Sequence, residues 1–156
     1  MKDLYDTEDI KLMRAAEGVD GFDVNRLQAI RQFASAAGMK RIGLANCIVF
    51  SRQTKIIMAY FSRYFDVFAA DCKYGRMTKE NLFGENSRKV LCNPAGQADF
   101  LNQKKTDLNI SIGLCVGHDM IFSQKSLAPV TSFFVKDFMN EHDSAKAVMQ
   151  IARDVH

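Results

Sequence analysis

Four cysteines are the residues of this 156-residue chain whose chemistry stands out: Cys47, Cys72, Cys92 and Cys115. No two of them form the C-x2-C pair from which structural zinc sites are usually built. In a reducing compartment, such cysteines are buried small side chains, reactive thiols or ligands of zinc or an iron–sulfur cluster. Which of these applies depends on whether the fold brings distant cysteines together.

Composition narrows the class of protein. A hydrophobic fraction of 47% and a charged fraction of 25% are ordinary for a soluble chain, and we expect one domain over residues 1–156. The net charge of +3, without a dense basic run, does not indicate a nucleic-acid partner. No apolar run approaches the ~20 residues of a membrane span. The first residues lack the apolar core of a signal peptide, so we expect a cytoplasmic protein with free thiols.

Hydrophobic periodicity predicts an alternation of helices and strands. The predicted strands are 41–50, 66–72, 108–116 and 129–137; the predicted helices are 6–18, 23–40, 51–65, 93–105, 118–126 and 142–155. This order predicts an α/β fold: a three-layer sandwich around a four- or five-stranded, mostly parallel, doubly wound sheet of strand order 2-1-3-4. The helical pair within 1–40 is expected to pack on the sheet core formed by 41–156.

The predicted strands place all four cysteines at one edge of the sheet. Cys47 lies near the end of the first strand, Cys72 closes the second and Cys115 closes the third. Cys92 stands at the start of the helix that leads into the third strand, and such a helix begins at the edge where the preceding strand ended. Open α/β proteins bind ligands at this edge.

We therefore predict a metal site made of Cys72, Cys92 and Cys115, with Cys47 as a fourth ligand. Three cysteines around a 4Fe-4S cluster would leave one iron free to act on a substrate, whereas four would close the site. Zinc is the alternative cofactor. For any single cysteine, burial as core filler is the simpler explanation.

Three further side chains are expected beside the thiols: His118, Asp119 and Lys73. His118 follows Cys115 on the same turn and could transfer a proton, and Asp119 could orient it. Lys73 could hold an anion or favour a thiolate. Helix capping and solvation are the simpler explanations for these residues. Without a metal, Cys92 could instead be a nucleophile, its thiolate favoured by the helix dipole and His118 serving as base.

Several stretches resemble one uncharacterised bacterial and archaeal family, domain-of-unknown-function family 1847. They are "IGLANCI", "DCKYG", "LCNPAGQADFLNQKKTDLNISIGLCVGHDMIFSQKSLAPVT" and "VKDFMNEH", within residues 41–143. Members of this family are often described as metal-binding, which implies metal ligands among the four cysteines and a site that includes His118 and Asp119. Members often begin with a cysteine-rich leader, whereas this chain has no cysteine before Cys47.

The expected function is a cysteine-ligated metalloprotein, iron–sulfur rather than zinc, that binds or transforms a small molecule at the edge of the sheet. The long polar segment 73–91 could close over the site, and His142 could reach it. A thiol enzyme without metal is one alternative. A non-enzymatic α/β interaction module is another, in which helices within 3–38 dock a partner or a second copy as a homodimer. We expect neither a nucleic-acid nor a membrane partner.

Overall fold

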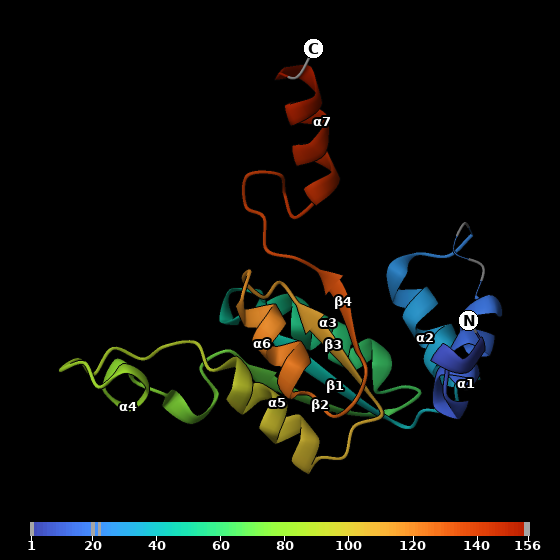
Figure 1. Ribbon diagram of the computed structural model, residues 1–156, viewed down its shortest axis with the longest axis horizontal. Helices are drawn as coiled ribbons and strands as arrows, with labels where there is room; N and C mark the ends of the chain where they lie inside the picture. The colour runs from blue at the N-terminus through green and yellow to red at the C-terminus, as the bar shows by residue number, and fades with distance from the viewer. Residues whose placement is uncertain (1, 20, 22, 155–156) are drawn as a thin grey trace.

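The computed structural model describes residues 2–19, 21 and 23–154. Its centre is a sheet of four parallel strands in the order β2-β1-β3-β4 (Figure 1). The strands are β1 (Arg41–Asn46), β2 (Asp66–Asp71), β3 (Leu108–Ile112) and β4 (Val130–Phe134). The predicted α/β class and strand order are therefore confirmed.

Helices follow the strands in alternation. They are α1 (Thr7–Glu17), α2 (Arg26–Ala36), α3 (Ser51–Phe61), α4 (Lys79–Phe83), α5 (Pro94–Gln103), α6 (His118–Lys125) and α7 (Ser144–Asp154), with short 3-10 turns η1 (Lys2–Leu4), η2 (Ile48–Phe50) and η3 (Tyr74–Arg76). Local sequence explains the helix starts. Asp6 and Asn25 each accept a backbone N–H at the start of α1 and α2, and Pro94 occupies the first position of α5, where its missing N–H costs nothing.

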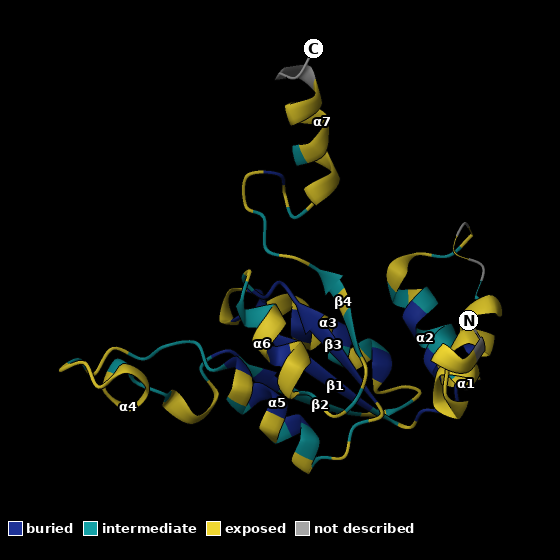
Figure 2. Cartoon of the chain, in the orientation of Figure 1, coloured by how far each residue is buried: buried dark blue, intermediate teal, exposed yellow. Residues whose placement is uncertain are grey.

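Both faces of the sheet are covered. One core cluster joins side chains of α2 and α3 to β1 and β3, and includes Ala34, Phe61, Leu44 and Ile110. The other joins α5 and α6 to the opposite face through residues such as Leu101 and Phe122. In Figure 2, much of the central sheet is coloured as buried. Because β1 and β3 are central and covered on both sides, they read as nearly continuous apolar runs.

The predicted strands were too long at the edge that carries the cysteines. The first prediction, 41–50, is wrong for its last four residues, because the chain leaves β1 at Asn46 and turns into η2. The third, 108–116, ends four residues early: Gly113 has a φ of +59°, which turns the chain out of the sheet. Apolar residues in these tight turns, such as buried Leu114, extended the strand pattern in the sequence.

Residues 73–91 form a hairpin-like arm rather than a plain loop. A β-bridge pairs Thr78 with Val90, and α4 lies at the far end of the arm. Figure 1 shows α4 projecting away from the sheet, so the arm is not folded over the edge where it begins. Asn93 N–H donates to the Cys72 carbonyl oxygen at 2.8 Å and closes the base of the arm.

The C-terminal helix α7 also stands apart from the body in Figure 1. Its exposed apolar side chains include Val148, Met149 and Ile151. Among the described residues, no helix has the length and apolar content that crossing a membrane requires.

Gln97 of α5 ties together the two strand ends that lead to Cys47 and Cys72. Its side chain is fully buried, and its Nε2 donates to the carbonyl oxygens of Asn46 at 3.1 Å and Ala70 at 2.7 Å. One amide thus fixes the last residue of β1 and the last but one of β2 relative to α5, at the edge of the sheet where the cysteines follow.

Replacing this amide should loosen both strand ends. Gln97→Leu keeps a buried side chain but leaves two buried carbonyls without this donor, and we expect it to lower the free energy of unfolding by about 1–3 kcal/mol. Urea denaturation measures the change. The control is Gln103→Leu on the same helix, where the side chain is exposed. Equal stability of the two variants would contradict the role given to Gln97.

Candidate functional site

Cys47 and Cys72 lie on adjacent strand ends. Cys47 directly follows β1, and its backbone N–H still donates to Ile112 of β3. Cys72 directly follows β2, which pairs with β1 in parallel register, Asn46 opposite Asp71. The backbone N–H of Ile48 points at the Cys72 Sγ at 3.4 Å. Both side chains are almost fully buried, so these two thiols lie inside the edge of the sheet rather than on its surface.

Cys72 and Cys92 meet at the base of the 73–91 arm. Their Sγ atoms are 3.7 Å apart, although the residues are 20 positions apart in the sequence. Lys73 adds a positive charge beside this pair, because its Nζ lies 3.6 Å from the Cys92 Sγ and 3.2 Å from the Val90 carbonyl oxygen. The base of the arm therefore brings the thiols of Cys72 and Cys92 and the ammonium of Lys73 together.

Lys136 joins the other two cysteines. Its Nζ donates to the Cys47 Sγ at 2.8 Å and to the Cys115 Sγ at 3.2 Å. Lys136 follows β4 by two residues, and its backbone N–H donates to the Leu114 carbonyl oxygen at 3.4 Å, which aligns it with the turn that carries Cys115. One ammonium thus bridges thiols from the ends of β1 and β3.

These contacts change the acidity of the thiols in opposite directions. Burial raises the pKa of Cys47, but the Lys136 ammonium and the Val49 N–H together lower it below the ordinary value. Burial, with the neighbouring Cys92 and Cys47, raises the pKa of Cys72 to about 12, although the Ile48 N–H acts to lower it. Of these two buried thiols, Cys47 is the one whose thiolate is favoured.

The structure arranges the four predicted ligands as a chain of contacts. Cys92 touches Cys72, the charge of Cys47 acts on Cys72, and Lys136 links Cys47 to Cys115. Cys47, expected only as a fourth ligand, lies in the middle of this series of contacts. Cys115 is connected to Cys47 through Lys136. Within the described residues, no three His, Cys, Asp or Glu side chains stand arranged to hold one metal ion.

The predicted proton-handling residues lie on the turn beyond Cys115. The backbone N–H groups of His118 and Asp119 both donate to the Cys115 carbonyl oxygen. The Asp119 carboxylate accepts the Met120 N–H at 2.8 Å, as a helix-start residue does. His142 packs edge-on against Phe50, with ring centroids 4.9 Å apart, and its Nδ1 accepts the Asp137 N–H. In the described part of the chain, the charged side chains that contact the sulfurs are lysines, and no histidine side chain is hydrogen-bonded to a sulfur.

Lys136 is the residue that sequence reasoning missed. The signal that could have found it was the same one that placed the cysteines, because Lys136 follows the fourth predicted strand and so belongs to the same edge. A lysine after a strand is ordinarily solvated, whereas this one is half-buried between two thiols.

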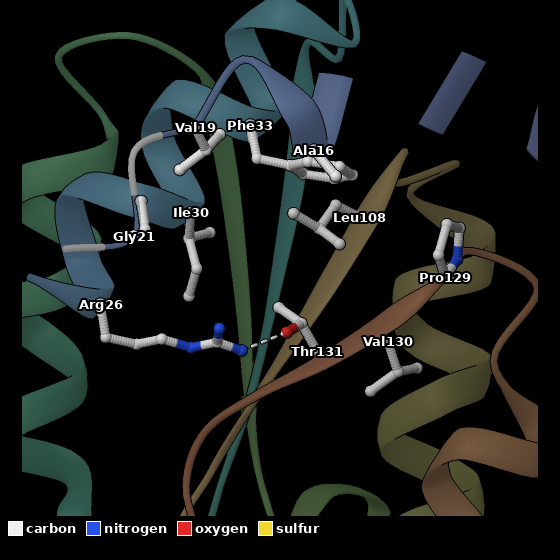
Figure 3. A pocket seen from close by; sticks show the side chains of 11 residues that line it. Ala16, Val19, Gly21, Arg26, Ile30, Phe33, Leu108, Pro129, Val130 and Thr131 are labelled. Atoms are coloured by element: carbon white, nitrogen blue, oxygen red, sulfur yellow. Dashed lines mark hydrogen bonds between the residues drawn. The ribbon is translucent and has the colours of Figure 1, made fainter. Parts of the chain in front are cut away.

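A groove of about 400 Å³ lies at the opposite edge of the sheet (Figure 3). Side chains of α2, such as Ile30 and Phe33, line one side, and Leu108 and Val130, at the starts of β3 and β4, line the other. Arg26 spans the groove to the Thr131 hydroxyl and the Ser132 carbonyl oxygen. This groove contains none of the cysteines and is mainly apolar, so it is separate from the thiol site.

Comparison with known proteins places this chain in a family. A stretch of 127 residues, 79% of this chain, is 39% identical to the uncharacterized protein MJ0455 of Methanocaldococcus jannaschii, and it covers 66% of that protein, just under two thirds. No solved structure matches the chain. Residues 1–133 match the family model described as "Protein of unknown function (DUF1847)". The chain therefore belongs to the DUF1847 family, whose function is unknown.

Proposed function

We propose that this protein is a cysteine-ligated metalloprotein whose centre is built on Cys72 and Cys92, and that metal binding draws Cys47 and Cys115 toward this pair to complete the ligand set. The observation that carries the proposal is the 3.7 Å separation of the Cys72 and Cys92 Sγ atoms. Two thiolates bound to one zinc ion at about 2.3 Å, in tetrahedral geometry, lie about 3.8 Å apart. The pair at the base of the arm has the spacing of two ligands of a single ion.

This spacing favours a single ion such as zinc over an iron–sulfur cluster. In a 4Fe-4S cluster, each cysteine sulfur binds a different iron atom, so the sulfurs stand farther apart than two ligands of one ion. Iron–sulfur ligation would require Cys72 and Cys92 to separate. A cluster therefore remains the alternative cofactor, and metal analysis distinguishes the two.

Charge supports the same donor set. Four thiolates around a divalent ion carry a net charge of about −2, which is costly in a buried place unless it is balanced. Lys73 and Lys136 each place an ammonium against the sulfurs. The Lys136 ammonium lies between Cys47 and Cys115. Upon metal binding it would remain as a hydrogen-bond donor to their sulfurs.

The site has the position at which open α/β proteins bind small molecules. Cys115 and Cys92 are partly exposed, so one side of the centre faces solvent. A small anionic molecule could approach there, with Lys73 as its counter-charge and His118, on the adjacent turn, as a proton donor or acceptor. We propose such a molecule as ligand or substrate.

Metal analysis of the anaerobically purified chain tests the proposal. We expect about one zinc per chain and, after exchange for Co²⁺, the absorption of a tetrahedral cobalt thiolate. Cys72→Ser and Cys92→Ser should each abolish that spectrum. His142→Asn is the control, since asparagine tolerates the φ of +67° at this position, and it should leave the spectrum unchanged.

Two outcomes would decide against a single ion. A brown protein containing iron and sulfide, bleached by Cys92→Ser, would identify the cluster instead. A chain without bound metal, even after growth with added zinc and iron, would remove the metal proposal altogether.

The second candidate function is thiol chemistry without a metal, and a specific observation favours it. The Lys136 ammonium stabilises the Cys47 thiolate, and a lysine-paired thiolate is the form in which cysteine acts as a nucleophile. For this role we propose Cys47, in addition to the Cys92 that the sequence suggested. The close burial of Cys47 limits it to small reactants.

Removing the Lys136 ammonium should make the Cys47 thiol less acidic. In the metal-free chain, Lys136→Met should raise the pKa of Cys47 and lower its thiolate fraction at neutral pH by roughly tenfold for each pKa unit. A pH titration of thiolate absorbance, with Cys47→Ser to identify the contribution of Cys47, measures this. Lys125→Met, at an exposed position of α6, is the control. An unchanged titration in Lys136→Met would contradict the pairing.

A further inference from the structure

Lys136 and Cys47 form an unusually short contact between an ammonium nitrogen and a sulfur atom. The ammonium nitrogen stands 2.8 Å from one sulfur and 3.2 Å from another, whereas the second lysine–cysteine pair, Lys73 and Cys92, is 3.6 Å apart. At 2.8 Å, the nitrogen and sulfur lie close to the span that a single oxygen atom between them would bridge. The pair is also shielded, because Cys47 is 5% exposed.

We propose that Lys136 and Cys47 are a site of oxidative modification, at which oxidation joins the lysine nitrogen and the cysteine sulfur through one oxygen atom. The product is a covalent Cys–S–O–NH–Lys link between the end of β1 and the segment after β4. The proposal does not require that the centre binds a metal, since it depends only on the contact between the two side chains.

The reaction balances with dioxygen as the oxidant. The thiolate and the ammonium, together with one O₂, give the bridge and one water. One S–O bond and one O–N bond form, and the O–O bond breaks. Sulfur and nitrogen each lose two electrons, dioxygen accepts all four, and two of the three ammonium hydrogens leave in the water. Hydrogen peroxide serves equally: two molecules yield the bridge and three waters.

The surroundings favour this product over deeper oxidation of Cys47. When the Cys47 sulfur is oxidised, it has the Lys136 nitrogen 2.8 Å away. The sulfenic acid that forms first lies against the lysine nitrogen, and a second oxidant equivalent then closes the O–N bond. Condensation of the two groups without that second equivalent would instead give an S–N sulfenamide and one water, a joined species about 2 Da below the summed masses. Cys115 contacts the same nitrogen at 3.2 Å, so further oxidation could extend the link to it.

A disulfide between Cys72 and Cys92 is the competing oxidation product. Their sulfurs are neighbours, but they must approach from 3.7 Å to bonding distance. The two products differ in what they consume: a disulfide leaves Lys136 free, whereas the bridge removes its amine. Peptide mapping therefore distinguishes them directly.

The test is mass spectrometry of the full chain after metal removal and exposure to hydrogen peroxide. Trypsin cannot cut after a bridged Lys136, so we expect the peptide 42–52, which contains Cys47, joined to 126–146. The joined species should exceed the summed masses by about 14 Da, one oxygen gained and two hydrogens lost, and excess dithiol should separate it.

Matched variants make the assignment specific. Lys136→Arg keeps a cation beside Cys47 but cannot form the bridge, and Cys47→Ser removes the sulfur, so both should lose the joined species. Lys73→Arg should retain it. The proposal is overturned if oxidised wild-type chain yields 42–52 only as a separate peptide, with cleavage after Lys136, or if Lys136→Arg gives the same joined species.

Discussion

The common direction of the four strands is the constraint on which the rest of this structure depends. Because all strands run in parallel, the residues that follow β1, β2, β3 and β4 emerge at one edge. Cys47, Cys72, Cys115 and Lys136 each follow a different strand. A sheet with one antiparallel strand would have sent one of these side chains to the opposite edge and broken the chain of contacts.

Two local devices turn this shared edge into a site. The 73–91 arm closes at its base and brings Cys92 back to Cys72. Lys136 then supplies a positive charge that holds Cys47 and Cys115 near one another. Proximity alone does not make four buried or half-buried thiols reactive or able to bind a metal. The Lys136 ammonium favours the thiolate of Cys47, and thiolates bind metals and react with oxidants.

Sequence reasoning predicted the sheet order and the edge but not the details of the site. The apolar runs of β1 and β3 and the helix-capping residues are local patterns, so they can be recognised in a single sequence. Contacts across the edge are not local: nothing near Lys136 in the sequence shows that it lies between two thiols from other strands. The ends of β1 and β3 were misplaced for a related reason, since buried residues in tight turns, such as Phe50 and Leu114, look like strand residues.

X-ray absorption at the zinc edge of the loaded protein tests the central claim, that cysteines distant in the sequence form one site, most directly. If the site is as described, the metal has a shell of three to four sulfur atoms at about 2.3 Å, and each Cys→Ser change replaces one sulfur with a shorter oxygen or nitrogen contact. A first shell of oxygen and nitrogen alone, or a sulfur count unaffected by Cys72→Ser and Cys92→Ser, would contradict it.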